Sequence, residues 1–315
     1  MFKLHLDTDI GGDIDDLCAL AMVLRWPDAD LLAITTNQDE RGRRAGYARY
    51  ALRLAGRDDI PAAAGADASL DCYRIYPGLP DEAVYWPEPI PPAPTPLDRA
   101  LDLLQRSIEQ GAIIAAVGAY TNLALLEKRS PGILCSANLV LMGGYVFPPQ
   151  EGYPAWGNDM DWNVQNDIGS AEIVIERSNP TLVPLSVTVE TALRRAHLPA
   201  LSQAGPLAQL IARQAEAFAI EYGNEAKYGQ TCSGLPDDTI NFQHDPLACA
   251  IALGWQDGVE ISGIPLKLAV KDGWLVQRIA DGGKPTRVVT RVNGPKFSEF
   301  WLDIVTSSRA TAQIA

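Results

Sequence analysis

Five aspartates lie within ten residues near the N-terminus, between positions 7 and 16. Carboxylates this close together repel one another strongly unless a cation or a bound polar ligand neutralises them. Residues before the run alternate between apolar and polar, as in a strand, and apolar residues follow it at helical spacing from Ile14 to Leu24. The run is therefore predicted to lie on a turn from a strand into a helix, where ligands bind in open α/β sheets.

Helix capping is the simplest alternative reading of this run. Asp13 could be a helix N-cap, and the helix dipole favours acidic residues such as Asp15 and Asp16 in a first turn. Asp7 and Asp9 precede the predicted helix, so capping does not account for them.

Two known acidic motifs fit the run less well than a simple cation site. An EF-hand loop needs a bidentate Glu where Cys18 stands, and it follows a helix rather than a strand. A phosphatase motif with two aspartates needs a hydroxyl residue or a valine where Gly11 stands. The run favours a hard cation such as Ca²⁺ or Mg²⁺, held by oxygen ligands.

Composition limits the class of protein. The chain has 315 residues, of which 47% are hydrophobic, enough for a large buried core. Its net charge of −13 argues against nucleic-acid binding, which needs a basic surface. No apolar run approaches the ~20 residues of a membrane helix, and the N-terminus lacks a signal-peptide core. Five scattered cysteines without a CxxC pair indicate a reducing, cytoplasmic setting without structural disulfides.

Strand-like and helix-like segments alternate along the chain, which predicts parallel strands joined by crossover helices. We expect one α/β domain over residues 1–315, with an open, mainly parallel, Rossmann-like sheet flanked by helices. After residue 264, two short strands and a helix over 294–304 are expected. The other expected strands are 31–35, 112–117, 139–142 and 181–185, and the other expected helices are 45–54 and one that begins at Thr121.

Two loops could cover a site, near residues 70–96 and 222–241. The first has eight prolines between positions 77 and 96, so it is predicted to be an extended surface loop that is either a rigid connection or a lid. Thr95 is expected to cap the helix that follows, with Pro96 as its first residue. After the second loop, Pro246 is expected to begin a helix, which puts His244 and Asp245 at its N-terminus.

Taken in chain order, the acidic run and four later motifs resemble the inosine-uridine nucleoside hydrolase (nucleoside N-ribohydrolase) family. The likeness extends from Asp7 to Asp245, through most of the chain. The four later motifs are Val117–Ala124, Met142-Gly-Gly144, Asp161-Trp-Asn163 with Asp167, and His244–Ala248.

The resemblance implies an enzyme that binds one Ca²⁺ and hydrolyses the N-glycosidic bond of ribonucleosides to ribose and free base. Asp9 would ligate Ca²⁺ and take the proton from the attacking water. Asp16 and Asp245 would be further ligands, and Thr121 would ligate through its backbone carbonyl. Asp15 would hold the ribose 2′- and 3′-hydroxyls together with the metal.

The resemblance also implies the other substrate contacts. Asp161 and Asn163 match the pair that binds the ribose, Met142 matches sugar-packing positions, and Asn37 matches an asparagine that contacts the ribose. Trp162 lies between two motif residues and is either core or pocket wall.

His244 matches the residue that assists departure of the nucleobase, and a nearby His suits the protonation that this step needs. Hydrolysis through an oxocarbenium-like sugar likewise suits a cluster of carboxylates.

The sequence departs from the family in three places, one of which is Asp161, where many relatives have the longer Glu. The acidic turn is two residues longer, which leaves open whether Asp13, Asp15 or Asp16 reaches the metal; Asp16 is favoured. The family's His-Gly lid motif is absent, so base preference is open. Aromatic residues of that region would stack either on the nucleobase or against their own loop. The region offers Cys72, Tyr73, Arg74, Tyr85 and Trp86.

Two further functions remain open. One is an N-glycoside hydrolase for a modified nucleoside, which the altered lid region suggests. The other is a non-catalytic, Ca²⁺-dependent nucleoside-binding protein, although such a binder would not need both Asp9 and His244. The expected partner is a small ribonucleoside, with no nucleic acid and no membrane, and relatives imply a homodimer or homotetramer.

Overall fold

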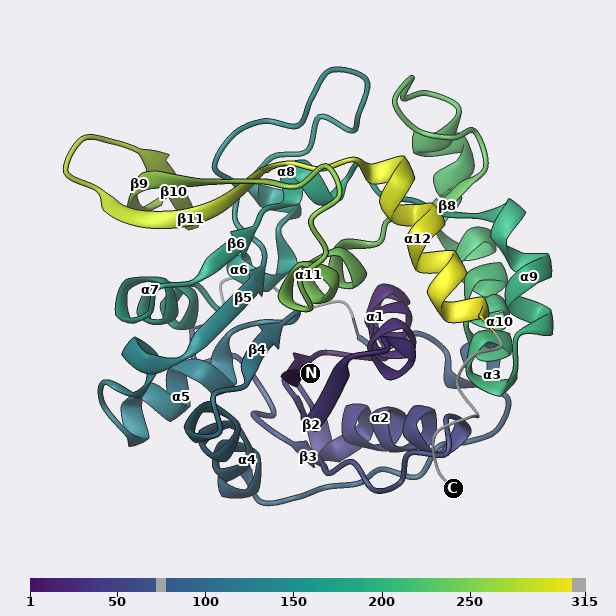
Figure 1. Cartoon of the computed structure of the whole chain (residues 1–315), viewed down its shortest axis with the longest axis horizontal. Helices are drawn as coiled ribbons and strands as arrows, with labels where there is room; N and C mark the ends of the chain where they lie inside the picture. Colours follow the sequence, from purple (N-terminus) through teal and green to yellow (C-terminus); the bar gives the residue numbers. More distant parts are fainter. Residues whose placement is uncertain (72–77, 308–315) are drawn as a thin grey trace.

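The computed structural model describes residues 1–71 and 78–307. A nine-stranded sheet forms its centre, in the order β10-β9-β11-β6-β5-β4-β1-β2-β3, and β7 and β8 form a separate pair (Figure 1). The strands are β1 (Phe2–Thr8), β2 (Ala29–Thr36), β3 (Ala62–Ala64), β4 (Ile113–Ala116), β5 (Asn138–Met142), β6 (Thr181–Val183), β7 (Leu193–Arg194), β8 (Thr239–Asn241), β9 (Glu260–Lys271), β10 (Trp274–Ile279) and β11 (Lys284–Arg291).

Within the part of the sheet ordered β11-β6-β5-β4-β1-β2-β3, every pair of neighbouring strands is parallel, which confirms the predicted mainly parallel α/β sheet. The segment after residue 264 is different from the prediction, because it forms three strands rather than two. β9 pairs antiparallel with both β10 and β11. Most of β9 is exposed, although its apolar residues alternate from Ile264 to Val270 in the way that is typical of a strand.

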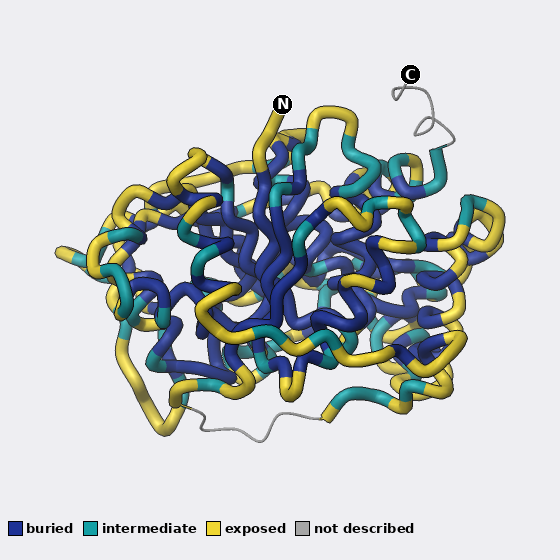
Figure 2. The backbone as a smooth tube through the Cα atoms, turned by 90° about the horizontal axis from the view of Figure 1, so that it is seen from below, coloured by how far each residue is buried: buried dark blue, intermediate teal, exposed yellow. Residues whose placement is uncertain are grey.

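Helices cover both faces of the sheet. One buried apolar cluster includes residues of α1, α11 and α12, and a second includes residues of α4, α5 and α7. Figure 2 shows the buried strands running through the middle of the molecule. The helices are α1 (Asp15–Arg25), α2 (Arg43–Leu54), α3 (Glu82–Tyr85), α4 (Leu97–Glu109), α5 (Thr121–Arg129), α6 (Trp162–Gln165), α7 (Ile168–Arg177), α8 (Leu185–Thr188), α9 (Leu198–Gln203), α10 (Pro206–Tyr222), α11 (His244–Ala252) and α12 (Gly294–Thr306).

Three expected helix starts are wrong by one or two residues. α1 begins after Ile14, which has no side-chain cap, so Asp13 is not the N-cap residue. α4 begins after Pro96, and the Thr95 hydroxyl instead donates to the carbonyl of Ala64. α11 begins at His244 rather than Pro246, which makes His244 and Asp245 part of the helix.

The proline-rich loop contains the short helix α3 and contributes to the core. Tyr85 and Trp86 are both buried, and the Trp86 ring stacks on Tyr47 with 4.3 Å between centroids. Their aromatic rings therefore do not cover a ligand site. Cys72, Tyr73 and Arg74 of the expected lid lie outside the described residues.

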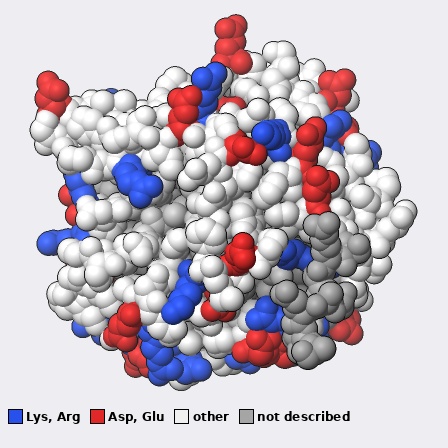
Figure 3. All heavy atoms as spheres, in the orientation of Figure 1, with Lys and Arg blue, Asp and Glu red and all other residues white. Residues whose placement is uncertain are grey.

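Charged side chains of both signs are interspersed over the face shown in Figure 3. No helix in the described part of the chain is long and apolar enough to cross a membrane. The four cysteines of the described ranges are free, and Cys18 and Cys249 are buried as expected.

Candidate active site

A cavity of about 260 Å³ opens among the loops that follow β1, β4 and β5, at the carboxyl edge of the parallel strands. Its wall brings together most of the site residues expected from the sequence, although they come from four separate segments. Those residues are Asp9, Asp15, Asp16, Met142, Asp161, Trp162, Asn163, His244 and Asp245.

The turn between β1 and α1 begins the site. Gly11 has φ +104°, a left-handed conformation that favours glycine, and a Cβ there would overlap the ring of Tyr47. The chain can therefore turn sharply over the ring and bring the start of α1 back toward the end of β1. Asp9 lies before this turn, and Asp15 and Asp16 begin the helix.

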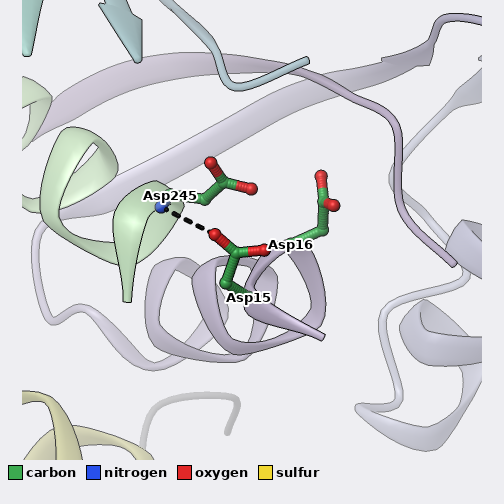
Figure 4. Close-up of side chains that lie close together, drawn as sticks. All are labelled: Asp15, Asp16 and Asp245. Atoms are coloured by element: carbon green, nitrogen blue, oxygen red, sulfur yellow. Dashed lines mark hydrogen bonds between the residues drawn. The ribbon is translucent and has the colours of Figure 1, made fainter. Parts of the chain in front are cut away.

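Asp15, Asp16 and Asp245 form a compact carboxylate cluster (Figure 4). The first two come from the start of α1 and the third from the first turn of α11. One oxygen of each lies within 4.8 Å of the others, and the backbone N–H of Asp245 donates to Asp15 Oδ2 at 3.3 Å. The cluster depends on the packing of α1 against α11, which places residues 230 positions apart side by side.

The electrostatics of the cluster suit a cation. Burial raises the pKa of Asp15, Asp16 and Asp245 well above its ordinary value, and the charges of neighbouring aspartates raise it further. The charge of Asp9 is the second cause of the shift at Asp16, which indicates that these two carboxylates are close. A bound divalent cation would offset both effects, and an all-oxygen donor set is the kind that Ca²⁺ prefers.

Asn37 and Thr121 do not line the cavity. Asn37 lies behind it: a Cβ added at Gly118 would be 2.7 Å from Asn37 Nδ2 and 2.8 Å from Asp9 Oδ1, so all three residues meet there. Asn37 Oδ1 is buried and has no hydrogen-bond partner among the described residues. Thr121 begins α5, and its hydroxyl donates to Asp167 at 2.6 Å.

The opposite wall comes from the loop after β5 and from α6. Asp161 caps α6 by accepting from the backbone of Val164, and it also accepts from the backbone N–H of Gly144. Asn163 Nδ2 donates to the carbonyls of Val117 and Met142, which leaves its Oδ1 as the atom that can accept from a ligand. These bonds fix both polar side chains before any substrate arrives.

His244 lies where this polar wall meets an aromatic wall, which is formed by Trp156, Tyr228 and Phe242. Thr188 Oγ1 is 2.6 Å from His244 Nδ1. Burial lowers the pKa of His244 to about 3, so the imidazole is neutral near pH 7. The ring of Phe242 lies 5.5 Å from that of His244 and 4.9 Å from that of Trp156. Tyr228 packs edge-on against Trp156 at 5.2 Å.

Comparison with known proteins decides the family. The model of the family described as "Inosine-uridine preferring nucleoside hydrolase" matches residues 4–299. The chain belongs to this family. It is a hydrolase that acts on N-glycosyl bonds. This agrees with the resemblance that the sequence motifs carry.

Curated relatives and solved structures support this membership. The pyrimidine-specific ribonucleoside hydrolase RihA of Salmonella arizonae is 30% identical over 260 residues, covering 78% of this chain and 77% of that protein. RihA of Citrobacter koseri is 30% identical over 259 residues, with the same coverage. The purine-preferring ribonucleoside hydrolase of Gardnerella vaginalis has the same fold, with a TM-score of 0.77 at 20% identity over 96% of this chain and 98% of that one. A plant nucleoside hydrolase gives a TM-score of 0.76 at 20% identity, over 97% and 99% of the two chains.

In this nucleoside hydrolase, sequence reasoning missed most of the aromatic wall. Trp156 and Phe242 each lie within five residues of a motif residue, so closeness to a motif was the available signal. The 222–241 segment was expected to be lid-like, and several of its side chains line the cavity. The described residues of the proline-rich loop, 78–96, do not line the cavity. The unassigned cavity residues are Asp13, Val117, Trp156, Met160, Leu185, Phe218, Tyr222, Asn224, Lys227, Tyr228, Asn241 and Phe242.

Proposed function

We propose that this chain hydrolyses the N-glycosidic bond of ribonucleosides with the help of one Ca²⁺, and releases ribose and a free nucleobase. The carrying observation is that the cluster of Asp15, Asp16 and Asp245 lines the same cavity as Asp9 and His244. A set of carboxylates beside a neutral imidazole suits a reaction that develops positive charge on the sugar and loses a base.

Asp9, Asp16 and Asp245 would hold the metal, together with the backbone carbonyl of Thr121. A bound Ca²⁺ would lower the pKa of a water molecule and attract the sugar hydroxyls. Asp9 Oδ1 is the general base in this proposal and takes the proton of the attacking water. Burial and the crowding of negative charge support the metal assignment, because both raise the pKa of these carboxylates and a bound cation would offset both effects.

The sugar would lie between the carboxylate cluster and α6. Asp15 would accept hydrogen bonds from the ribose 2′- and 3′-hydroxyls. Asn163 Oδ1 would accept another, since its Nδ2 is already bonded to the protein. Met142 would pack against the ring, and Asn37 would hold Asp9 in place from behind. Asp161 has both oxygens bonded to backbone N–H groups, so its contribution to ribose binding would come from positioning Gly144 and α6.

The nucleobase would lie against the aromatic wall, next to His244 and the half-exposed ring of Trp162. If His244 Nδ1 accepts from the Thr188 hydroxyl, the neutral ring carries its proton on Nε2. Nε2–H can then donate a hydrogen bond to the departing base while the imidazole stays neutral. Relatives are named both pyrimidine-specific and purine-preferring, so the base is best found by experiment.

The test is ribose release from a panel of purine, pyrimidine and modified nucleosides in the presence of Ca²⁺. We expect release that EDTA abolishes, that Ca²⁺ restores and that Asp9→Asn lowers at least about 10³-fold. Asp159→Asn is the matched control, because Asp159 is an exposed carboxylate near the site that does not line the cavity. Ca²⁺-dependent nucleoside binding without any ribose release would favour a binding protein instead. Release that survives both EDTA and Asp9→Asn would show that the metal and base assignments are wrong.

A further inference from the structure

The turn between β1 and α1 brings a further carboxylate, that of Asp13, into the cavity. Asp15 and Asp16 are buried at 5% and 3% exposure, whereas Asp13 is exposed and lines the same cavity. Asp13 belongs neither to the carboxylate cluster of Asp15, Asp16 and Asp245 nor to the proposed sugar contacts. It belongs to the outer part of the cavity, beyond the buried carboxylates.

Asp13 is held in a fixed position there. Its Oδ1 accepts from the side-chain amide of Asn241 and from the backbone N–H of Ile14, both at 2.5 Å. Asn241 is 2% exposed and belongs to β8, which pairs with β7. A rigid strand therefore orients the carboxylate, and the ordering entropy of the side chain is lost before a ligand binds.

The position of Asn241 puts Asp13 beside the aromatic wall. Asn241 directly precedes Phe242, whose ring packs against Trp156 and His244. Burial raises the pKa of Tyr222, and the charge of Asp13 adds to this shift, which indicates that the two side chains are close. The carboxylate thus stands at the edge of the surface against which a base would stack, on the side of α10.

We propose that Asp13, positioned by Asn241, selects nucleobases that carry an exocyclic amino group over analogues with a keto oxygen at the same position. This inference rests on the proposed hydrolase function and names its preferred substrates. A carboxylate only accepts hydrogen bonds at neutral pH, so an amino N–H is its natural partner, as in the pairing of Asp or Glu with cytosine N4. A keto oxygen in the same place has no N–H to donate. The keto oxygen and the carboxylate oxygen that faces it would then both lack a hydrogen-bond partner.

The test measures kcat/KM for two matched pairs, cytidine with uridine and adenosine with inosine, and for 4-nitrophenyl riboside. The nitrophenyl compound has the same sugar but no amino or ring N–H group. We expect the amino member of each pair to be favoured about 10- to 100-fold, the range that a hydrogen bond to a charged group supplies. Asp13→Asn should lower the amino-to-keto ratio at least about tenfold, and Asp13→Ala should do the same, whereas Asp159→Asn should leave the ratio at its wild-type value.

The outcomes separate the two proposals. Unchanged amino-to-keto ratios in both Asp13 variants would overturn this inference alone. An equal loss for all substrates, including the nitrophenyl riboside, would overturn it by assigning Asp13 to the sugar. A preference for the keto members would overturn it in favour of Lys227, the one Lys or Arg among the described residues that line the cavity. A wild-type protein that cleaves none of these compounds would overturn the proposed function, and this inference with it.

Discussion

Gly118→Ala is the most specific perturbation that the site offers. Gly118 follows β4, and the side chains of Asn37 and Asp9 meet above its Cα. A Cβ there would be 2.7 Å from Asn37 Nδ2 and 2.8 Å from Asp9 Oδ1, whereas ordinary van der Waals contact begins at 3.4 Å. One methyl group should therefore disturb the proposed general base without removing any functional atom.

The expected size of the effect follows from these distances. To reach ordinary contact the Asp9 carboxylate must move by about 0.6 Å, and a displacement near 1 Å can cost about 10²-fold in rate. We therefore expect kcat/KM to fall about 10- to 100-fold. Gly118 does not have a positive φ, so the substitution adds no backbone strain, and overpacking should cost about 1–3 kcal/mol of stability.

The assay is kcat/KM with 4-nitrophenyl riboside, together with thermal unfolding of the same samples. Gly263→Ala is the matched control, because Gly263 lies in β9 with no atom within 4 Å of an added Cβ. The control should keep wild-type activity and stability. A folded Gly118→Ala protein with wild-type kcat/KM would refute the placement of Asp9 at the reacting water.

Three further predictions test other parts of the argument. Thr188→Val removes the hydroxyl that contacts His244, so kcat for nucleosides should fall about tenfold while the nitrophenyl riboside, with its better leaving group, is affected less. Ca²⁺ should raise the Tm of EDTA-treated protein, and Asp16→Asn should remove that increase. Burial raises the pKa of Glu190 from 4.5 to about 7, so its contribution to stability is complete below pH 4.5 and is lost as pH rises through 7. Urea unfolding should show Glu190→Gln to be more stable than wild type by about 1–2 kcal/mol near pH 8, after a discount for solvent screening, with a smaller difference near pH 5.

Local pattern was enough to predict the acidic turn. Apolar alternation in β1 and helical spacing in α1 place the aspartates between them, because strand and helix periods differ clearly over such lengths. The prediction that the parallel strands continue through β2, β4, β5 and β6 also followed from local pattern.

Long-range packing was beyond the reach of pattern alone. Asp245 joins Asp15 and Asp16 only because α11 packs on α1, and without the family resemblance nothing in its own segment indicates a ligand. The aromatic wall combines Trp156, Tyr228 and Phe242 from three separate segments. Tyr85 and Trp86 show the opposite error, since aromatic residues in a proline-rich loop proved to be core.

Local donors explain how so many carboxylates stay together in a chain that must fold before it binds an ion. Asp7 is fully buried and accepts from Thr35 and Asn122 at 2.5 and 2.8 Å, which ties the end of β1 to β2 and α5. The Thr8 hydroxyl donates to Asp16, and Asn241 donates to Asp13. Hydrogen bonds to a carboxylate stabilise its charged form, so each of these donors opposes the effect of burial.

Asp15 and Asp245 have less help of this kind, because the contact between them is a single backbone N–H, that of Asp245, which donates to Asp15 at 3.3 Å. Their side chains are therefore the ones that a cation would affect most. If that is correct, EDTA should lower the Tm of the protein without unfolding it at room temperature, and the near-UV circular dichroism of the folded state should be kept. Global unfolding on EDTA treatment would instead mean that the local donors are too weak and that the ion is needed for the fold itself.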